Sequence, residues 1–223
     1  APKDDYPDIW AQLYLSDGTP VGDNFMVNED PENTYQTDPA LAVDANGNFI
    51  IAWQDDRNGF SEIYLQWFQF DGTPIGNNFP AEDTMYMANQ LIPAISMDDE
   101  GNFIVAWIDY RNGNYDIYCR RFLNDGSPIG QSFQVNSDSL ASNQTWPRVS
   151  IQNDGKFVVS WTSGEYGNHD VFAQRFLSDG TPDSLNFMIP NTGELNQTYQ
   201  NILVRDDFIY SVWQDNRGGQ NGY

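Results

Sequence analysis

Apolar and polar positions recur along this chain in a unit of 54 residues. Asp-Gly pairs begin at Asp17, Asp71, Asp125 and Asp179, and each lies 54 residues after the last. Tryptophans keep the same step at Trp53, Trp107 and Trp161, and a further one follows at Trp213. A fixed period of this length is typical of repeat architectures, in which each repeat is one supersecondary unit that packs against its neighbours.

Each unit contains four segments with the pattern of β-strands. The first is "PALAV" or "PAISM", and the second, such as "NFIIAW" or "KFVVSW", is apolar on both faces and should be buried on both. The third, "EIYLQWFQF" or "DIYCRRFL", alternates, and the fourth, "NNFPA" or "QSFQV", is short. Turn sequences such as "DANGN" and "DGTP" separate them. Because no segment has a long apolar period of 3.6 residues, we expect no helices.

Four strands per unit, with a tryptophan and turn glycines, are typical of a β-propeller blade. The recurring Trp, Phe and Ile side chains then form the packing between blades, because a single blade cannot bury both of its faces. We therefore expect an all-β, four-bladed propeller as a single domain over residues 1–223. Its complete blades should cover residues 36–83, 90–137 and 144–191.

The two ends of the chain supply complementary halves of one further blade. "QNILV" and "FIYSVW" have the pattern of the first two strands, and "DIWAQLYLSDGTPVGDNFMV" has the pattern of the third and fourth. We expect a shared blade from residues 8–28 and 199–223, which closes the ring and removes open sheet edges. Two chains that form a larger ring, or a longer protein of which this chain is a part, are the alternatives.

Composition narrows the range of partners. The 32 acidic and 10 basic residues give a net charge of −22, which repels nucleic acids and anionic membranes. No apolar run approaches the roughly 20 residues that span a bilayer. Cys119, the single cysteine, occupies a repeat position held elsewhere by Leu or Ala, so we expect a core residue. The "NQT" sequences at Asn143 and Asn196 match a glycosylation sequon, but their recurrence in the unit favours a structural role.

The repeat also resembles a known family of sequences. The runs "QTDPALAVDANGNFIIAWQD", "EIYLQWFQFDGTPIGNNF" and "VFAQRFLSDGTP" are similar to repeats in large secreted and surface proteins of bacteria, including adhesin-like proteins with haemolysin-type calcium-binding repeats. The resemblance covers nearly the whole chain. It implies secretion or display on a bacterial cell surface, and a binding or structural role. The opening "APKDDYPDIW", which reads as a mature N-terminus, agrees with that localisation.

Asp/Arg pairs recur in the loop after the second strand. They are Asp55/Arg57, Asp109/Arg111 and Asp215/Arg217, and the third complete blade has "TSGEYGNHD" in their place. Such a pair fixes a loop through charge-assisted hydrogen bonds. The alternative is a ring of carboxylates, Asp55, Asp109 and Asp215, that binds Ca²⁺ at millimolar concentrations. No D-x-[DN]-x-[DN]-G loop accompanies them, and no other cofactor is indicated.

Aromatic residues that depart from the repeat are the candidates for ligand binding. Trp146 stands where the other blades have Asp38, Ile92 and Tyr199. Exposed aromatic rings beside amides and carboxylates suit sugars or a protein partner, although they can equally cover the ends of a core. His169, the only histidine, decorates a loop of the same face. The full set of candidates is Trp146, Tyr110, Tyr166, Tyr35, Tyr86 and His169.

These observations predict a non-enzymatic extracellular module that recognises a glycan or a protein on the face formed by the D-x-R-x-G and interblade loops. A structural subunit that associates with copies of itself is the second hypothesis. A glycoside hydrolase or lyase with a propeller fold is the third, and it would need converging carboxylates that no motif here selects.

Overall fold

The computed structural model describes residues 6–29, 34–82, 87–137, 142–165, 168–189 and 196–216. Within these ranges the protein is all-β, with sixteen strands in five antiparallel sheets and no α-helix. No helix that could span a membrane occurs in the part that is described. The prediction of an all-β fold built from four-stranded sheets is confirmed.

Three sheets have four strands and follow one another along the chain. The first comprises β3 (Gln36–Val43), β4 (Phe49–Asp55), β5 (Glu62–Phe68) and β6 (Pro74–Pro80). The second comprises β7 (Gln90–Met97), β8 (Phe103–Asp109), β9 (Asp116–Phe122) and β10 (Pro128–Gln134). The third comprises β11 (Gln144–Ile151), β12 (Phe157–Glu165), β13 (Asn168–Phe176) and β14 (Phe187–Met188). Each sheet is a simple antiparallel meander in chain order, as in a propeller blade.

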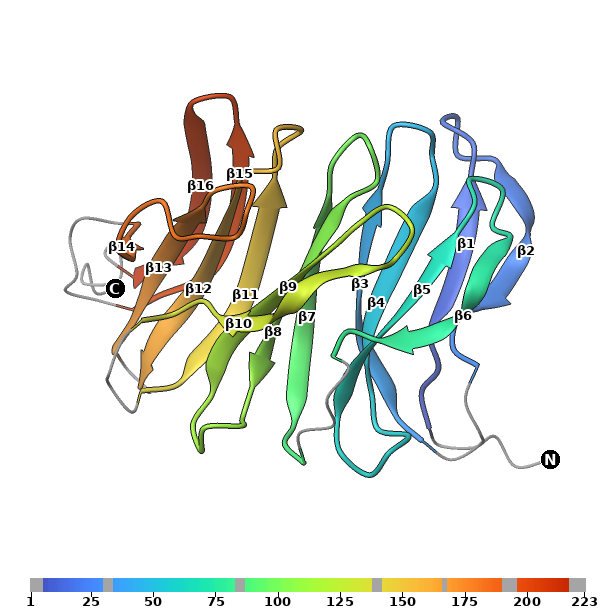
Figure 1. The fold of residues 1–223 in the computed structure, drawn as a ribbon. Coiled ribbons are helices and arrows are strands. Elements are labelled where there is room, and N and C mark those ends of the chain that lie inside the picture. The colour runs from blue at the N-terminus through green and yellow to red at the C-terminus, as the bar shows by residue number, and fades with distance from the viewer. Residues whose placement is uncertain are drawn as a thin grey trace, which may run out of the picture.

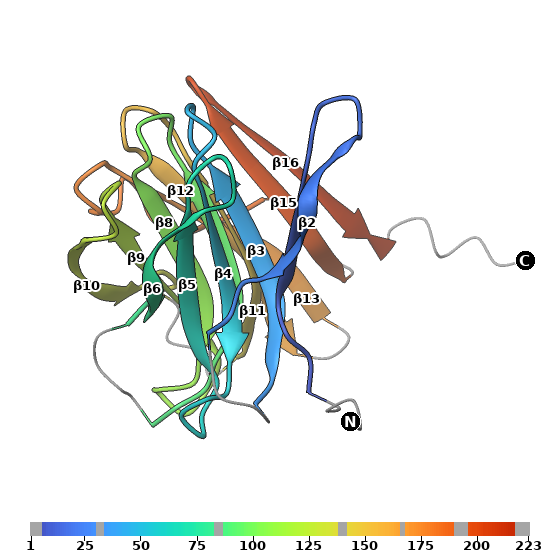
Figure 2. The ribbon, with the colours of Figure 1, turned by 90° about the vertical axis from the view of Figure 1, so that its right-hand side faces the viewer.

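A two-stranded sheet lies at each end of this array. One consists of β1 (Trp10–Tyr14) and β2 (Pro20–Met26), and the other of β15 (Gln197–Arg205) and β16 (Phe208–Asp215). Figure 1 shows the five sheets side by side, with these two pairs at opposite ends. The first strands β3, β7, β11 and β15 contact one another in that order and line the inner side of the array, whereas β6 and β10 lie on its outer side (Figure 2).

Neighbouring blades are joined by apolar side chains that alternate between the faces of each sheet. Ile50 and Ala52 of β4 pack against Val105 and Trp107 of β8. Equivalent clusters join the second blade to the third, the third to β15–β16, and β1–β2 to the first. The tryptophans of the repeat are at most 1% exposed in the three complete blades. The prediction that these residues form the packing between blades is therefore confirmed, and Cys119 is a fully buried core residue as expected.

Asparagines at one repeat position connect successive blades through hydrogen bonds. Asn143 Oδ1 accepts the backbone N–H of Tyr115 at 3.2 Å, and Asn196 Oδ1 accepts that of His169 at 2.9 Å. Asn89 does the same for Ser61 at 3.4 Å. Each donor belongs to the blade before its asparagine. These bonds give the recurring asparagine the structural role expected from the repeat.

The predicted shared blade is not seen in this structure. The described parts of the two chain ends form separate two-stranded sheets, β1–β2 and β15–β16, and residues 217–223 lie outside the described ranges. The described residues do not show closure into a four-bladed ring, which stays a prediction. Apolar side chains are exposed at both ends of the described array, among them Leu41 and Val43 at one end and Leu203 and Val212 at the other.

Candidate functional site

The first strand of every blade is interrupted by a bulge at the same repeat position. The residues at this position have left-handed φ angles of 54°, 50°, 55° and 54°, and they are Asp38, Ile92, Trp146 and Tyr199. The strand register shifts at each of these points. Positive φ is unfavourable for residues with bulky side chains, so its recurrence shows that the surrounding fold imposes it. A bulge of this kind redirects a side chain out of the strand's normal alternation.

The bulges surround a hollow of about 350 Å³ on the inner side of the array, which we call the axial hollow. Its volume lies within the range of small-molecule sites. The residues that line it come from four consecutive first strands. They are Asp38, Pro39, Ala40, Ile92, Pro93, Ala94, Ile95, Trp146, Arg148, Val149 and Asn201.

Trp146 offers an aromatic surface to this hollow. Its side chain is 38% exposed, and its ring centre lies 5.9 Å from that of Tyr199 on the adjacent strand. The backbone is held in place, because Gln200 Nε2 donates to the Trp146 carbonyl at 2.6 Å and Gln200 Oε1 accepts from Thr162. The structure thus places the leading sequence candidate in a cavity. It adds Tyr199 and Asp38, which the sequence presented only as repeat equivalents of Trp146.

Arg148 is a further residue of the hollow that sequence reasoning did not select. Its guanidinium is partly buried, and this burial lowers the pKa of Arg148 from its ordinary value. Nη1 donates to the carbonyl of Pro147 at 2.8 Å. A signal for it was present in the repeat, because Arg148 stands where the first two blades have Ala40 and Ala94.

The recurring Asp/Arg pairs form closed hydrogen-bond networks. Asp55 accepts both Nε and Nη2 of Arg57, at 2.9 and 2.6 Å, and also the indole N–H of Trp53 at 2.8 Å. Asp109 repeats this arrangement with Arg111 and Trp107. A cation at these carboxylates would have to displace an arginine. The geometry thus matches the loop-fixing interpretation, and calcium binding remains a prediction.

Asp215 continues the pattern only in part. Its Oδ2 accepts the indole N–H of Trp213 at 3.2 Å, while Arg217 lies outside the described residues. No cluster of three or more potential metal ligands occurs in the described ranges.

The aromatic candidates that the structure describes, Tyr110 and Tyr35, are not brought together with Trp146. Tyr110 and Tyr35 are both exposed, and each forms an aromatic pair of its own, with Tyr115 at 5.2 Å and with Tyr6 at 4.9 Å. His169 is partly buried at the start of β13, opposite Gly164 of β12. Tyr86 and Tyr166 lie outside the described residues, so their predicted role stays untested.

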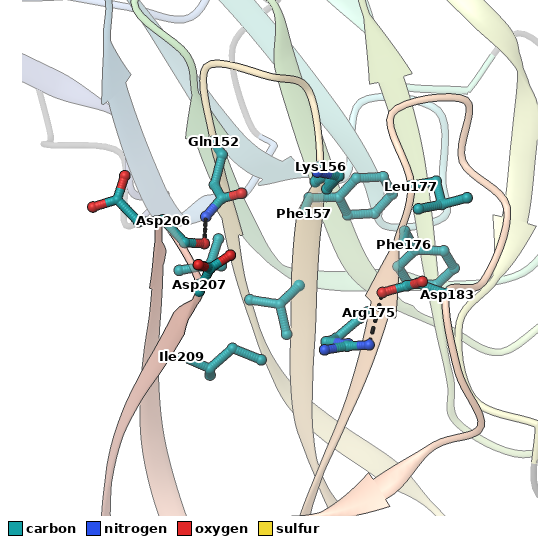
Figure 3. A pocket seen from close by; sticks show the side chains of 12 residues that line it. Gln152, Lys156, Phe157, Arg175, Phe176, Leu177, Asp183, Asp206, Asp207 and Ile209 are labelled. Carbon is teal, nitrogen blue, oxygen red and sulfur yellow. Dashed lines mark hydrogen bonds and ion pairs between the residues drawn. The ribbon is translucent and has the colours of Figure 1, made fainter.

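A second hollow, of about 490 Å³, lies between the third blade and the β15–β16 sheet (Figure 3). Arg175 pairs there with Asp183 at 2.7 Å, and Gln152 donates to the carbonyl of Asp206 at 2.6 Å. Unlike the axial hollow, this one lies beside the last sheet, in which the structure describes only the two strands β15 and β16. We therefore interpret this hollow as a place where further strands could pack against the array, and not as a ligand site.

No protein-family model matches this sequence, and no curated protein sequence matches it. Solved structures do resemble the fold. The GH93 α-L-arabinofuranosidase of Fusarium graminearum, in complex with arabinobiose, has a TM-score of 0.58 and 11% identity over 95% of this chain and 76% of that chain. The α-L-arabinanase of Penicillium chrysogenum, also with arabinobiose, has a TM-score of 0.56 and 11% identity over 92% and 67%.

An N-acetylgalactosamine deacetylase from F. plautii, in complex with blood group B trisaccharide, has a TM-score of 0.51 and 12% identity. The match covers 79% of this chain, which spans only 60% of the deacetylase. These neighbours are propeller-like carbohydrate-active proteins. At such identities the likeness shows the fold alone.

Proposed function

We propose that this protein is a carbohydrate-binding propeller whose ligand occupies the axial hollow. The observation that carries the proposal is Trp146, an aromatic ring held in the hollow at a position where the repeat has no fixed residue. A planar ring offers an apolar surface to one face of a sugar, while nearby polar groups orient its hydroxyls. Asp38 and Asn201 supply such groups from the facing strands. The carbohydrate-active structural neighbours support a glycan over a protein ligand.

Binding without hydrolysis is the form of this function that the hollow favours. A glycosidase places two carboxyl groups on either side of the scissile bond. Asp38 is the one carboxylate among the described residues that line the axial hollow. Hydrolysis or elimination, as in a propeller-fold hydrolase or lyase, is the second candidate because the structural neighbours include glycosidases. A screen for release of reducing sugar separates the two.

Replacing Trp146 by alanine should weaken saccharide binding by roughly 1–3 kcal/mol, the range of an aromatic anchor. Stability should change little, because the ring is partly exposed. Calorimetric titration with the hits of a glycan array, and with arabinobiose and blood group B trisaccharide, measures the loss. Tyr110→Ala is the matched control, since Tyr110 is exposed in a separate aromatic pair and should leave binding unchanged. If Trp146→Ala instead lowered the stability of the protein but left the saccharide affinity of the folded protein unchanged, the ring would serve only to cover the end of the core.

We also propose that the array closes, with β15–β16 and β1–β2 completing one blade. Leu203, Tyr210 and Val212 are each more than half exposed at one end of the array, and so are Leu41 and Val43 at the other. Between the first and second blades the equivalent surfaces are covered: Ala42, Ile95 and Met97 all pack against the buried cluster that joins these blades.

The hairpins give a second argument for closure. Arg121 Nη1 donates to the carbonyl of Ser178 in the next blade's hairpin at 2.7 Å. Arg175 occupies the same repeat position and borders the open hollow of Figure 3. The hairpin over residues 15–20, "LSDGTP", repeats the sequence of residues 177–182. If the ring closed, Arg175 could therefore donate to the N-terminal hairpin as Arg121 donates to the hairpin of the third blade.

A cysteine pair tests closure directly. We expect the double variant Leu41→Cys/Leu203→Cys to form a disulfide within one chain under mild oxidation, seen as a faster-migrating monomer. The native Cys119 should not interfere, because it is fully buried and burial raises the pKa of its thiol. The control is a mixture of the two single variants. A cross-linked dimer from that mixture would contradict closure within one chain and favour self-association through the same surfaces.

A further inference from the structure

Arg148 differs from three other arginines, Arg57, Arg111 and Arg120, whose side chains are largely buried. Arg57 pairs with Asp55 at 2.6 Å, and Arg111 pairs with Asp109 and Glu82. Arg120 lies 3.9 Å from Glu82. Arg148, by contrast, forms no ion pair with any carboxylate in the part of the chain that the structure describes, and its one hydrogen bond there is to the Pro147 carbonyl.

The scaffold does not require an arginine at this position. The first two blades have Ala40 and Ala94 in the same slot, and the last sheet has Asn201. All of these residues line the axial hollow. Alanine is therefore compatible with the backbone bulge and with the packing of the first strand. The arginine adds a positive charge where the repeat needs none, two residues from the exposed ring of Trp146.

The chemistry of such a group points to an oxyanion. A guanidinium binds a carboxylate or sulfate through parallel N–H···O bonds, and its partial burial strengthens the interaction relative to water. One hydrogen bond to a carbonyl leaves the remaining N–H groups available to a ligand. Asp38 also lines the hollow, but it is an exposed side chain on another strand, where solvent screens its charge.

We propose that Arg148 makes the axial hollow a subsite for an acidic saccharide, with the sugar ring on Trp146 and its oxyanion on the guanidinium. This inference rests on the proposed carbohydrate-binding function and names the class of sugar. The oxyanion is a uronate carboxylate or a sulfate ester. The net charge of −22 repels any such ligand at long range, so selection must come from the short-range contact.

Matched saccharide pairs test the proposal. The probes are digalacturonate, its neutral counterpart galactobiose, and a galactobiose carrying one sulfate, each titrated calorimetrically into the whole chain. The wild-type protein should bind at least one acidic probe about 10–100-fold more tightly than galactobiose, the range of a hydrogen bond to a charged group. The acidic probe that binds more tightly distinguishes carboxylate from sulfate.

Arg148→Ala is the decisive variant, because alanine is the residue of the first two blades and should leave folding intact. It should abolish the preference for the acidic probe and leave the affinity for galactobiose within about twofold. Arg148→Lys, which keeps the charge but loses the planar fork, should retain only part of the preference. Unchanged thermal melting of both variants confirms that the fold is preserved.

The alternative results separate this inference from the function on which it rests. If the wild-type protein bound acidic and neutral probes with equal affinity, the proposed role of Arg148 would be overturned. If Trp146→Ala then weakened the binding of both probes, saccharide binding in the hollow would still be supported. An Arg148→Ala protein that loses both probes equally would show a general packing role. If none of the three probes bound, the inference would be overturned. If no saccharide of the glycan array bound either, the proposed function would be overturned as well.

Discussion

Deletion of residues 1–27 is expected to give insoluble or molten protein. β1 and β2 cover the face of the first blade, where Ile9 and Val27 pack on Phe49, Ile51 and Trp53. Removing them exposes this apolar surface whether or not the ring closes, and an exposed sheet face favours aggregation. Sedimentation, near-ultraviolet circular dichroism and dye binding on the truncated chain measure the effect.

A single substitution provides the control for the deletion. Val21→Asp changes an exposed residue of β2, and its repeat equivalent Ile75 is exposed even in a complete blade. This variant should remain folded. If the truncated chain were monomeric with an unchanged, sharp melt, both the packing of β1–β2 on the first blade and the closure proposal would be wrong.

Asp109→Ala should cost about 3–5 kcal/mol of unfolding free energy, the range for removing one partner of a buried ion pair. The Asp109 carboxylate is fully buried. It accepts the Trp107 indole N–H at 2.9 Å, and Arg111 both through Nε at 2.9 Å and through its backbone N–H at 2.9 Å. Without it, the indole N–H and part of the guanidinium lose their acceptors. Urea unfolding followed by tryptophan fluorescence gives the difference.

Two further variants bracket this result. Asp125→Ala removes an exposed turn carboxylate that accepts the backbone N–H of Ser127, and it should cost no more than about 1 kcal/mol. Asp109→Asn keeps an acceptor for Trp107 but loses the charge opposite Arg111, so it should fall between the two. A loss below about 1 kcal/mol for Asp109→Ala would show that the Asp/Arg pair does not stabilise the loop.

Much of the fold could be predicted because each blade is encoded locally. The 54-residue period, the turn glycines and the doubly apolar second strand are properties of neighbouring residues, and they indicate sheet order and blade packing. The candidate site was less accessible. Trp146 could be selected because it breaks the repeat, but its φ of 55° and its position at the axis depend on bulges that alternation alone does not reveal.

Arg148 illustrates what only the tertiary structure decided. In the sequence it is one of ten basic residues, and only its departure from the Ala40 and Ala94 of the first two blades sets it apart. Whether Arg148 has a carboxylate partner depends on which residues of the other blades lie near it, because the two partners of an ion pair can be far apart in the sequence. The same reasoning applies to Asp55 and Asp109. Their recurrence beside arginines predicted loop-fixing pairs, with a calcium ring as the alternative, and the fold adds the indole N–H that each carboxylate also accepts. The sequence by itself therefore determined the repeating unit and its core, since those follow from local periodicity. The tertiary structure decided which polar groups are already satisfied and which face a cavity.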